Sequence, residues 1–150
     1  MAERLRRRVG ASEQRHSGQI VVCIEGALPP SYVWRAGREV PVQAVVRQRA
    51  MAWFGRLRVW DTEHNNGVLI YLQLTERRIE IVADRGLQRC AGAQDWQAVV
   101  DGLAAQLKAG QFEAGLTQAL EEVSALLVAH FPRTADNTVP NELPNTVVRV

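Results

Sequence analysis

The stretch RLRVWDTEHNNGVLIYL, residues 56–72, holds the densest group of side chains that could bind a cation. Asp61, Glu63 and Asn65 alternate in it, and their side-chain oxygens are the hard donors that Ca²⁺ and Mg²⁺ prefer. The spacing is similar to the start of an EF-hand loop. However, an EF-hand needs glycine at its sixth position and an acid at its twelfth, where this chain has Asn66 and Leu72. The stretch therefore predicts a divalent-cation loop of another kind.

A further oxygen donor, Asp84, is expected to reach this loop through a β-hairpin. The apolar runs at 68–74 and 79–83 have the length of strands, and only the short segment TERR separates them. So short a connection makes the second strand return antiparallel to the first. Asp84 then comes back to the end of the sheet where the 61–66 loop lies. The predicted metal ligands are Asp61, Glu63, Asn65 and Asp84.

Two alternatives to this site remain open. Asn and Asp also serve purely structural loops, because they tolerate positive φ and bond to nearby backbone, and Asn66-Gly67 fits that use. In addition, open α/β sheets usually bind ligands beyond the carboxyl ends of their parallel strands, which points to Glu25, Gly26 and Glu76 at the opposite end. The loop end is preferred because its polar residues are denser.

The segments that must position these residues predict a layered α/β fold. QIVVCIEG, residues 19–26, is an apolar run without alternation, which indicates a central strand covered on both faces. A helix is expected from about 38 to 54, so the strands on either side of it should be parallel. Two more helices follow, each with one apolar stripe: Trp96, Val99, Val100, Leu103 and Leu107, then Phe112, Leu116, Leu120, Val123 and Leu127. The predicted fold class is α/β, a small mixed β-sheet sandwiched between helices in a single domain.

The composition fits a globular domain and excludes several classes of function. The chain has 150 residues, 47% of them hydrophobic and 23% charged, with a net charge of +2. Five arginines lie within residues 1–16, and Lys108 is the single lysine, so the body lacks the basic surface that nucleic-acid binding needs. Cys23 and Cys90 lack the spacing of a zinc site or a disulfide framework, and both are expected to be reduced and buried.

The two ends of the chain differ from the body. Residues 1–16 predict a basic N-terminal helix or arm, and residues 132–150, rich in Pro, Asn and Thr, predict a flexible tail with a strand-like end, TVVRV. No apolar run reaches the length of a membrane span, and no signal peptide is recognised. The sequence therefore predicts a cytoplasmic monomer, with association with a membrane as an alternative.

Several short motifs together resemble the TPM domain, which is found in bacterial proteins and in a thylakoid-lumen acid phosphatase of plants. The matching residues are Ser17-Gly18, Asn66-Gly67-Val68-Leu69, Glu76-Arg77, Gly86-Leu87 and the stretch AGQFEAGL, so the resemblance covers residues 17–131. It implies an α/β/α sandwich, divalent-metal binding that is often calcium binding, and phosphatase activity in a few members. The family usually has Asp where this chain has Asn65, and Glu where it has Gln88.

If the chain is a phosphatase, the same end of the sheet offers residues for that reaction. A divalent ion would polarise a phosphoryl oxygen and lower the pKa of a bound water. Arg85 and the backbone amide of Gly86 would hold a phosphate oxygen, and His64 would protonate the leaving group. The hypothesis from a different class is a non-catalytic interaction module for membrane or envelope proteins, which would use residues 1–16 or 132–150 for contact.

Overall fold

The computed structural model describes residues 3, 4, 6, 7, 19–35, 40–61, 66–75, 77–88, 91–130 and 147–149. Within these ranges the order of elements is strand β1, helices α2 and α3, strands β2 and β3, helices α4, α5 and α6, and strand β4. Their bounds are β1 Gln19–Glu25, α2 Pro30–Arg35, α3 Val42–Arg56, β2 Gly67–Gln73, β3 Arg78–Ala83, α4 Arg85–Gln88, α5 Ala93–Lys108, α6 Phe112–His130 and β4 Val147–Arg149.

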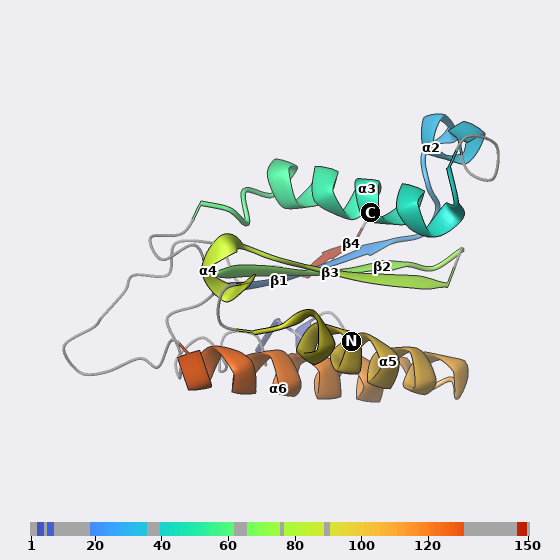
Figure 1. Cartoon of the computed structure of the whole chain (residues 1–150). Coiled ribbons are helices and arrows are strands. Elements are labelled where there is room, and N and C mark those ends of the chain that lie inside the picture. The colour runs from blue at the N-terminus through green and yellow to red at the C-terminus, as the bar shows by residue number, and fades with distance from the viewer. Residues whose placement is uncertain are drawn as a thin grey trace.

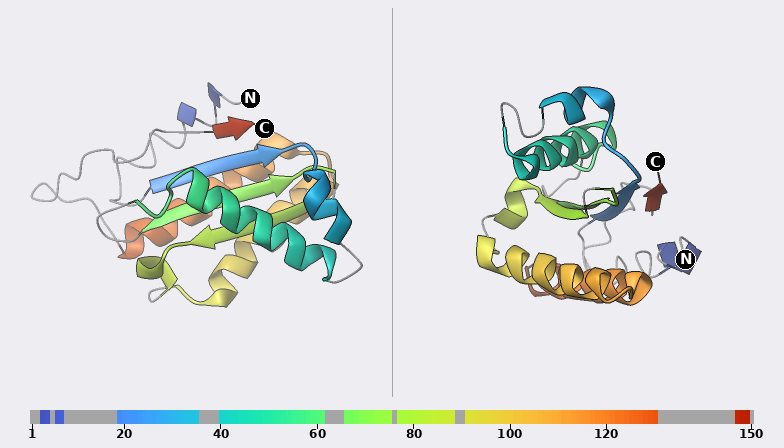
Figure 2. Two further views of the ribbon diagram at one scale, coloured as in Figure 1. Left: turned by 90° about the horizontal axis from the view of Figure 1, so that it is seen from above. Right: turned by 90° about the vertical axis from the view of Figure 1, so that its right-hand side faces the viewer.

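The strands form one mixed sheet in the order β3-β2-β1-β4. β1 is parallel to β2 and to β4, whereas β2 and β3 are antiparallel. Figure 2 shows that β3 alone has its arrow reversed. The predicted mixed sheet, the parallel pair and the hairpin are therefore confirmed. The strand-like end of the tail is also present as β4, while residues 132–146 lie outside the described residues.

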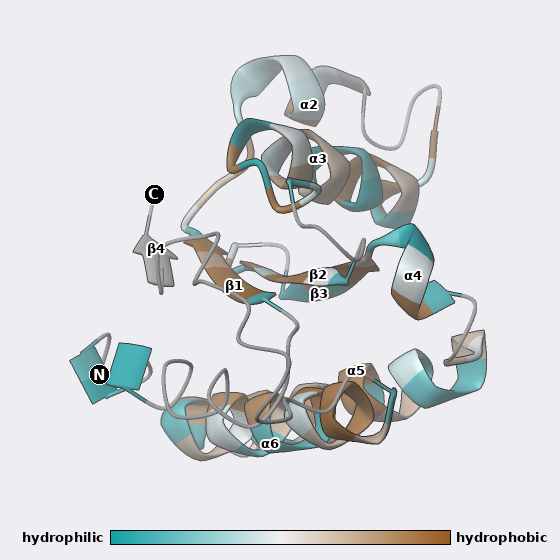
Figure 3. Ribbon diagram, turned by 90° about the vertical axis from the view of Figure 1, so that its left-hand side faces the viewer, coloured by the Kyte–Doolittle hydropathy of each residue, from teal (hydrophilic) through white to brown (hydrophobic). Residues whose placement is uncertain are grey.

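Helices cover both faces of the sheet (Figure 1). Alternate residues of β1, β2 and β3 enter two separate apolar layers, because successive side chains of a strand point to opposite faces. Ile20, Val68 and Ile81 pack toward α5 and α6, and Val21 and Leu69 pack toward α3. β1 is hydrophobic along most of its length in Figure 3, as a strand covered on both faces should be. The α/β/α sandwich is thus the observed fold.

Two short helices were not predicted. α2 begins at Pro30, in a stretch rich in turn residues that predicted a loop, and proline suits the first turn of a helix. α4 follows Asp84 directly and has four residues. α3 also continues to Arg56, two residues beyond the predicted end. No helix in the described part of the chain is long and apolar enough to span a membrane.

Gly67 has a role that differs from the predicted one. The pair Asn66-Gly67 suggested a structural loop with positive φ or a side-chain bond to nearby backbone, but neither residue has positive φ. Instead, a Cβ atom at Gly67 would overlap the main-chain oxygen of Val59. Glycine is needed here because the chain after α3 passes very close to the start of β2. This contact holds the beginning of the predicted cation loop against the sheet.

Candidate functional site

Asp84 and Asp61 lie at the same end of the sheet. The main-chain N–H of Asp84 donates to the oxygen of Gly67 at 2.9 Å, which places Asp84 beside the first residue of β2. The backbone of Val59 lies against Gly67, and Asp61 comes two residues after Val59. The N–H of Asp61 donates to the main-chain oxygen of Arg58. The tight reversal between β2 and β3 therefore returns the acid at 84 to the loop end. Glu63, His64 and Asn65 lie outside the described residues.

The carboxylate of Asp84 is divided between two environments. Its Oδ1 accepts a hydrogen bond of 2.7 Å from the N–H of Arg85, and its main-chain oxygen accepts from the N–H groups of Leu87 and Gln88. Asp84 thus caps the start of α4. Its Oδ2 is buried and has no hydrogen-bond partner among the described residues. An anionic oxygen without a partner is costly to bury, so this atom is a good candidate ligand for a cation.

A pocket of about 460 Å³ opens beside Asp84. One wall is apolar and comes from Met51 and Phe54 of α3 and from Trp60 in the turn that follows it. The indole of Trp60 is held by a hydrogen bond of 3.2 Å from Nε1 to the oxygen of Gly55. The polar side of the pocket is formed by Asp84 together with Arg47, Arg85 and Gln88.

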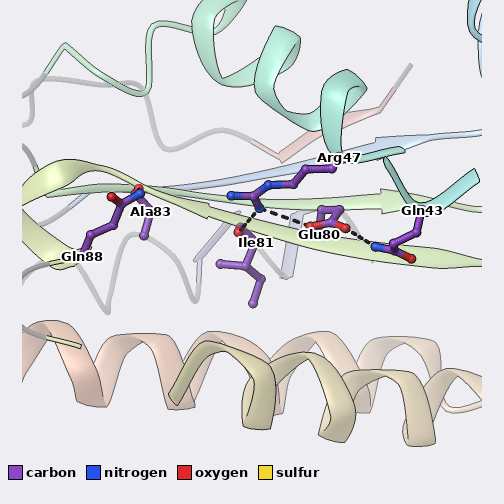
Figure 4. A network of polar contacts seen from close by, with 6 residues as sticks. All are labelled: Gln43, Arg47, Glu80, Ile81, Ala83 and Gln88. Carbon is purple, nitrogen blue, oxygen red and sulfur yellow. Dashed lines mark hydrogen bonds and ion pairs between the residues drawn. The ribbon is translucent and has the colours of Figure 1, made fainter. Parts of the chain in front are cut away.

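Arg47 is already engaged in structural contacts (Figure 4). Its guanidinium donates to the carboxylate of Glu80 at 3.1 Å and to the main-chain oxygen of Ile81 at 2.7 Å. The carboxylate of Glu80 also accepts a hydrogen bond from Gln43. Ile81 belongs to β3, an edge strand, so Arg47 binds a carbonyl that the sheet leaves unpaired. Arg47 is therefore not free to bind an anion. Among the described residues that line the pocket, Arg85, which is exposed, is the cation available to bind one.

Asp61 is engaged in an ion pair with Arg58. Its carboxylate accepts a hydrogen bond of 2.9 Å from Arg58, and the side chain is 51% exposed. Among the described residues no group of three or more His, Cys, Asp or Glu side chains could hold a metal ion. The structure describes two of the four predicted ligands: Asp84, which offers one buried oxygen, and Asp61, which would have to leave Arg58.

The opposite end of the sheet, beyond the carboxyl end of β1, is closed by a buried polar cluster. The Glu25 carboxylate, in a residue only 3% exposed, accepts bonds of 2.8 and 2.7 Å from Nε and Nη2 of Arg49. It also accepts a 2.7 Å bond from the Tyr71 hydroxyl and a 3.4 Å bond from the Trp53 indole. Arg49 lies over the rings of Tyr32 and Trp53, at 5.1 and 5.0 Å from their centroids.

The electrostatics of this cluster keep Glu25 charged. Burial alone would raise the pKa of Glu25, but the hydrogen bonds from Arg49 and Tyr71 outweigh burial and lower the pKa. Burial, and then the bond to Glu25, raises the pKa of Tyr71. Burial and the nearby Glu25 charge raise the pKa of Cys23 to about 12. The carboxylate of Glu25 is therefore not free for a ligand, and Glu76, the other acid predicted for this end, lies outside the described residues.

Sequence reasoning named Glu25 but missed its partners, although a signal was present. Glu25 is an acid at the end of an apolar strand, and Arg49 lies within the apolar stripe of α3. A buried acid needs a buried cation, so the two could have been paired from the pattern. Met51 and Arg47 of the pocket gave no such signal, because only packing of α3 against β3 brings them to Asp84.

Comparisons with known proteins agree with this architecture. The family model described as the TPM domain matches residues 2–126. The solution structure of the BA42 protein from the psychrophilic bacterium Bizionia argentinensis is 27% identical, with a TM-score of 0.81 over 99% of this chain and 92% of that one. The N-terminal domain of a P. gingivalis protein is 18% identical, with a TM-score of 0.61 over 88% and 78% of the two chains, and shares the fold. No curated protein sequence matches the chain.

Proposed function

The chain belongs to the TPM domain family, and on that premise we propose that it binds a divalent cation through Asp84, with low phosphomonoester phosphatase activity at the same end of the sheet. The observation that carries the proposal is the buried Oδ2 of Asp84, which has no partner in the described part of the chain. A cation would satisfy this oxygen. Carboxylate oxygens are the ligands that Ca²⁺ and Mg²⁺ prefer.

The other ligands would come from the chain that leads into β2. Asp61 is close in the fold and would have to exchange its ion pair with Arg58 for the cation. That exchange is inexpensive, because an exposed ion pair contributes only about 0.2–1 kcal/mol. Glu63 and Asn65 stay predicted ligands, since both follow Asp61 closely in sequence.

The pocket next to Asp84 has features that a phosphomonoester would use. A bound divalent ion supplies charge neutralisation at a phosphoryl oxygen and a more acidic water. The guanidinium of Arg85 would hold a second phosphoryl oxygen. The N–H of Gly86 would do the same, because it makes no hydrogen bond to Asp84, whereas the N–H groups of Arg85, Leu87 and Gln88 do. The apolar wall would receive the organic part of the substrate. His64 stays the predicted proton donor to the leaving group.

A cation titration tests the binding step. Backbone amide resonances of Asp61 and of residues 84–86 are expected to shift as Ca²⁺ or Mg²⁺ is added to the millimolar range. Asp84→Asn keeps the cap at Oδ1 but removes the charge, and it should weaken binding at least about tenfold. Asp101→Asn is the matched control, because Asp101 lies on the exposed surface of α5 and bonds only to Gln97 among the described residues.

Turnover of a generic phosphomonoester tests the chemical step. Arg85→Gln should lower turnover and leave the cation titration unchanged, because Arg85 is assigned to the phosphate and not to the metal. Unchanged turnover in Asp84→Asn would eliminate the phosphatase proposal. An absence of cation shifts in the wild type, together with capture of a partner protein that depends on residues 132–150, would favour the interaction module over the cation site.

A further inference from the structure

A second cavity, of about 420 Å³, lies at the end of the sheet opposite Asp84. It is bounded by the turn between β2 and β3 and by the turn between α5 and α6, which lie at the same end of the molecule in Figure 1. We infer that this cavity binds a medium-chain carboxylate, with the acyl chain in the apolar interior and the carboxylate at a cationic rim. This inference does not depend on the cation site.

The interior of the cavity is apolar and continuous with the core. Ile79 of β3 is buried in the cluster between the sheet and α5 and α6, and Leu107 and Phe112 pack against that cluster. Leu74, Ala104 and Gly110 complete the apolar lining, and Leu74 is 39% exposed. A large apolar side chain exposed at the mouth of an apolar cavity is a feature of ligand sites, because a ligand removes that surface from water.

The rim carries two positive charges. Arg77 lies in the β2–β3 turn and Lys108 lies in the last turn of α5, and both are exposed. Among the described residues neither cation is in an ion pair, and no acid lines the cavity. Two such cations at an apolar mouth complement a single anionic head group with an apolar tail.

The lining favours an acyl chain over a peptide. Apart from Arg77 and Lys108, no lining side chain in the described residues carries a hydrogen-bonding group. A peptide would bury amide groups without partners, which is costly, whereas an acyl chain has none to satisfy. A volume near 420 Å³ lies at the small end of the range for small-molecule pockets, which is about 300–1,000 Å³. These properties select a short, single-chain amphiphile.

Titration with decanoate tests the inference. Saturable shifts are expected at the amides of Leu74, Arg77, Ile79, Leu107 and Phe112. Each buried methylene strengthens binding about fourfold, so affinity should rise from hexanoate to octanoate to decanoate until the cavity is filled. Decyltrimethylammonium has the same tail and a cationic head group, and it should bind much more weakly.

Variants separate the roles of charge and cavity. Arg77 has a φ of 52°, so Arg77→Gly removes the charge and keeps the turn. Arg77→Gly and Lys108→Gln should each weaken decanoate binding about two- to fivefold, and the double variant about tenfold. Ala104→Trp should fill the cavity and abolish binding. Arg85→Gln, at the other end of the sheet, is the control and should bind as the wild type does.

Three results would overturn the inference. The first is equal affinity for decanoate and decyltrimethylammonium, because the rim charges would then have no effect. The second is unchanged binding in the double variant of Arg77 and Lys108, which does not alter the core and is expected to fold. The third is decanoate shifts confined to residues outside the cavity.

Discussion

Replacing Glu25 by Gln is expected to destabilise the protein strongly, because it leaves Arg49 buried without a counter-charge. The two side chains are only 4% and 9% exposed, and they share a bidentate pair of hydrogen bonds at 2.8 and 2.7 Å. Gln keeps one acceptor oxygen for Tyr71 or Arg49 but removes the negative charge. The perturbation therefore tests the charge and leaves the shape of the cluster nearly unchanged.

The size of the effect follows from the burial of both partners. Breaking a buried ion pair by removing one partner costs about 3–5 kcal/mol. The rings of Tyr32 and Trp53, which lie beside Arg49, would still stabilise the cation, so the lower end of this range applies. We expect the free energy of unfolding to fall by about 3 kcal/mol, which corresponds to a decrease in Tm of about 6–12 °C for a chain of this size.

Urea unfolding at neutral pH, followed by far-UV circular dichroism, measures this loss. Arg49→Met alone should also be destabilising, and the double variant of Glu25 and Arg49 should be more stable than the sum of the two single effects predicts. A loss below about 1 kcal/mol in Glu25→Gln would refute the claim that this pair is desolvated and strongly coupled.

The effect of Glu25 should depend on pH with a definite sign. The pKa of Glu25 is lowered in the folded protein, so the folded state favours the ionised form. Its contribution to stability is fully present above the ordinary Glu pKa of about 4.3, and it is lost as pH falls through the folded-state pKa. The stability difference between wild type and Glu25→Gln should therefore shrink below about pH 4.

Three further predictions concern the rest of the fold. Gly67→Ala should lower the free energy of unfolding by at least about 2 kcal/mol in urea melts, because the added Cβ would overlap the backbone of Val59. Cys23 is fully buried and its pKa is raised to about 12, so in a Cys90→Ser variant it should resist a thiol reagent at pH 8 until urea unfolds the chain. Arg47→Ala should destabilise by about 1 kcal/mol and increase light scattering, because it frees a carbonyl on the edge strand β3.

Most of the fold could be predicted because the apolar patterns are local. The unbroken run at 19–26 and the apolar run before TERR indicate covered strands, and helical stripes mark α5 and α6. α2 and α4 could not be predicted in this way, since they are too short to show a period and depend on Pro30 and on the cap at Asp84. Short helices are set by their ends and by tertiary contacts.

The candidate site could be predicted only in part. The hairpin was enough to bring Asp84 to the end of the sheet where Asp61 lies, because strand direction follows from the short turn. The ion pair of Asp61 with Arg58 and the engagement of Arg47 by Glu80 could not be read from spacing. The ion pair of Asp61 depends on the turn after α3, where Arg58 has a φ of 57°. The contact of Arg47 with Glu80 depends on how α3 packs against β3, which no local pattern specifies.

The two ends of the sheet have separable roles in this fold. Gly67 joins both halves of the candidate cation site, because its oxygen accepts from Asp84 and its missing Cβ admits the backbone of Val59, two residues before Asp61. A change at Gly67 should therefore reduce cation affinity as well as stability. Glu25 lies at the other end and contacts neither, so Glu25→Gln should lower stability and leave the cation affinity of the folded protein unchanged. If both variants altered affinity equally, the effect would reflect global loosening, and the site could not be assigned to the Asp84 end.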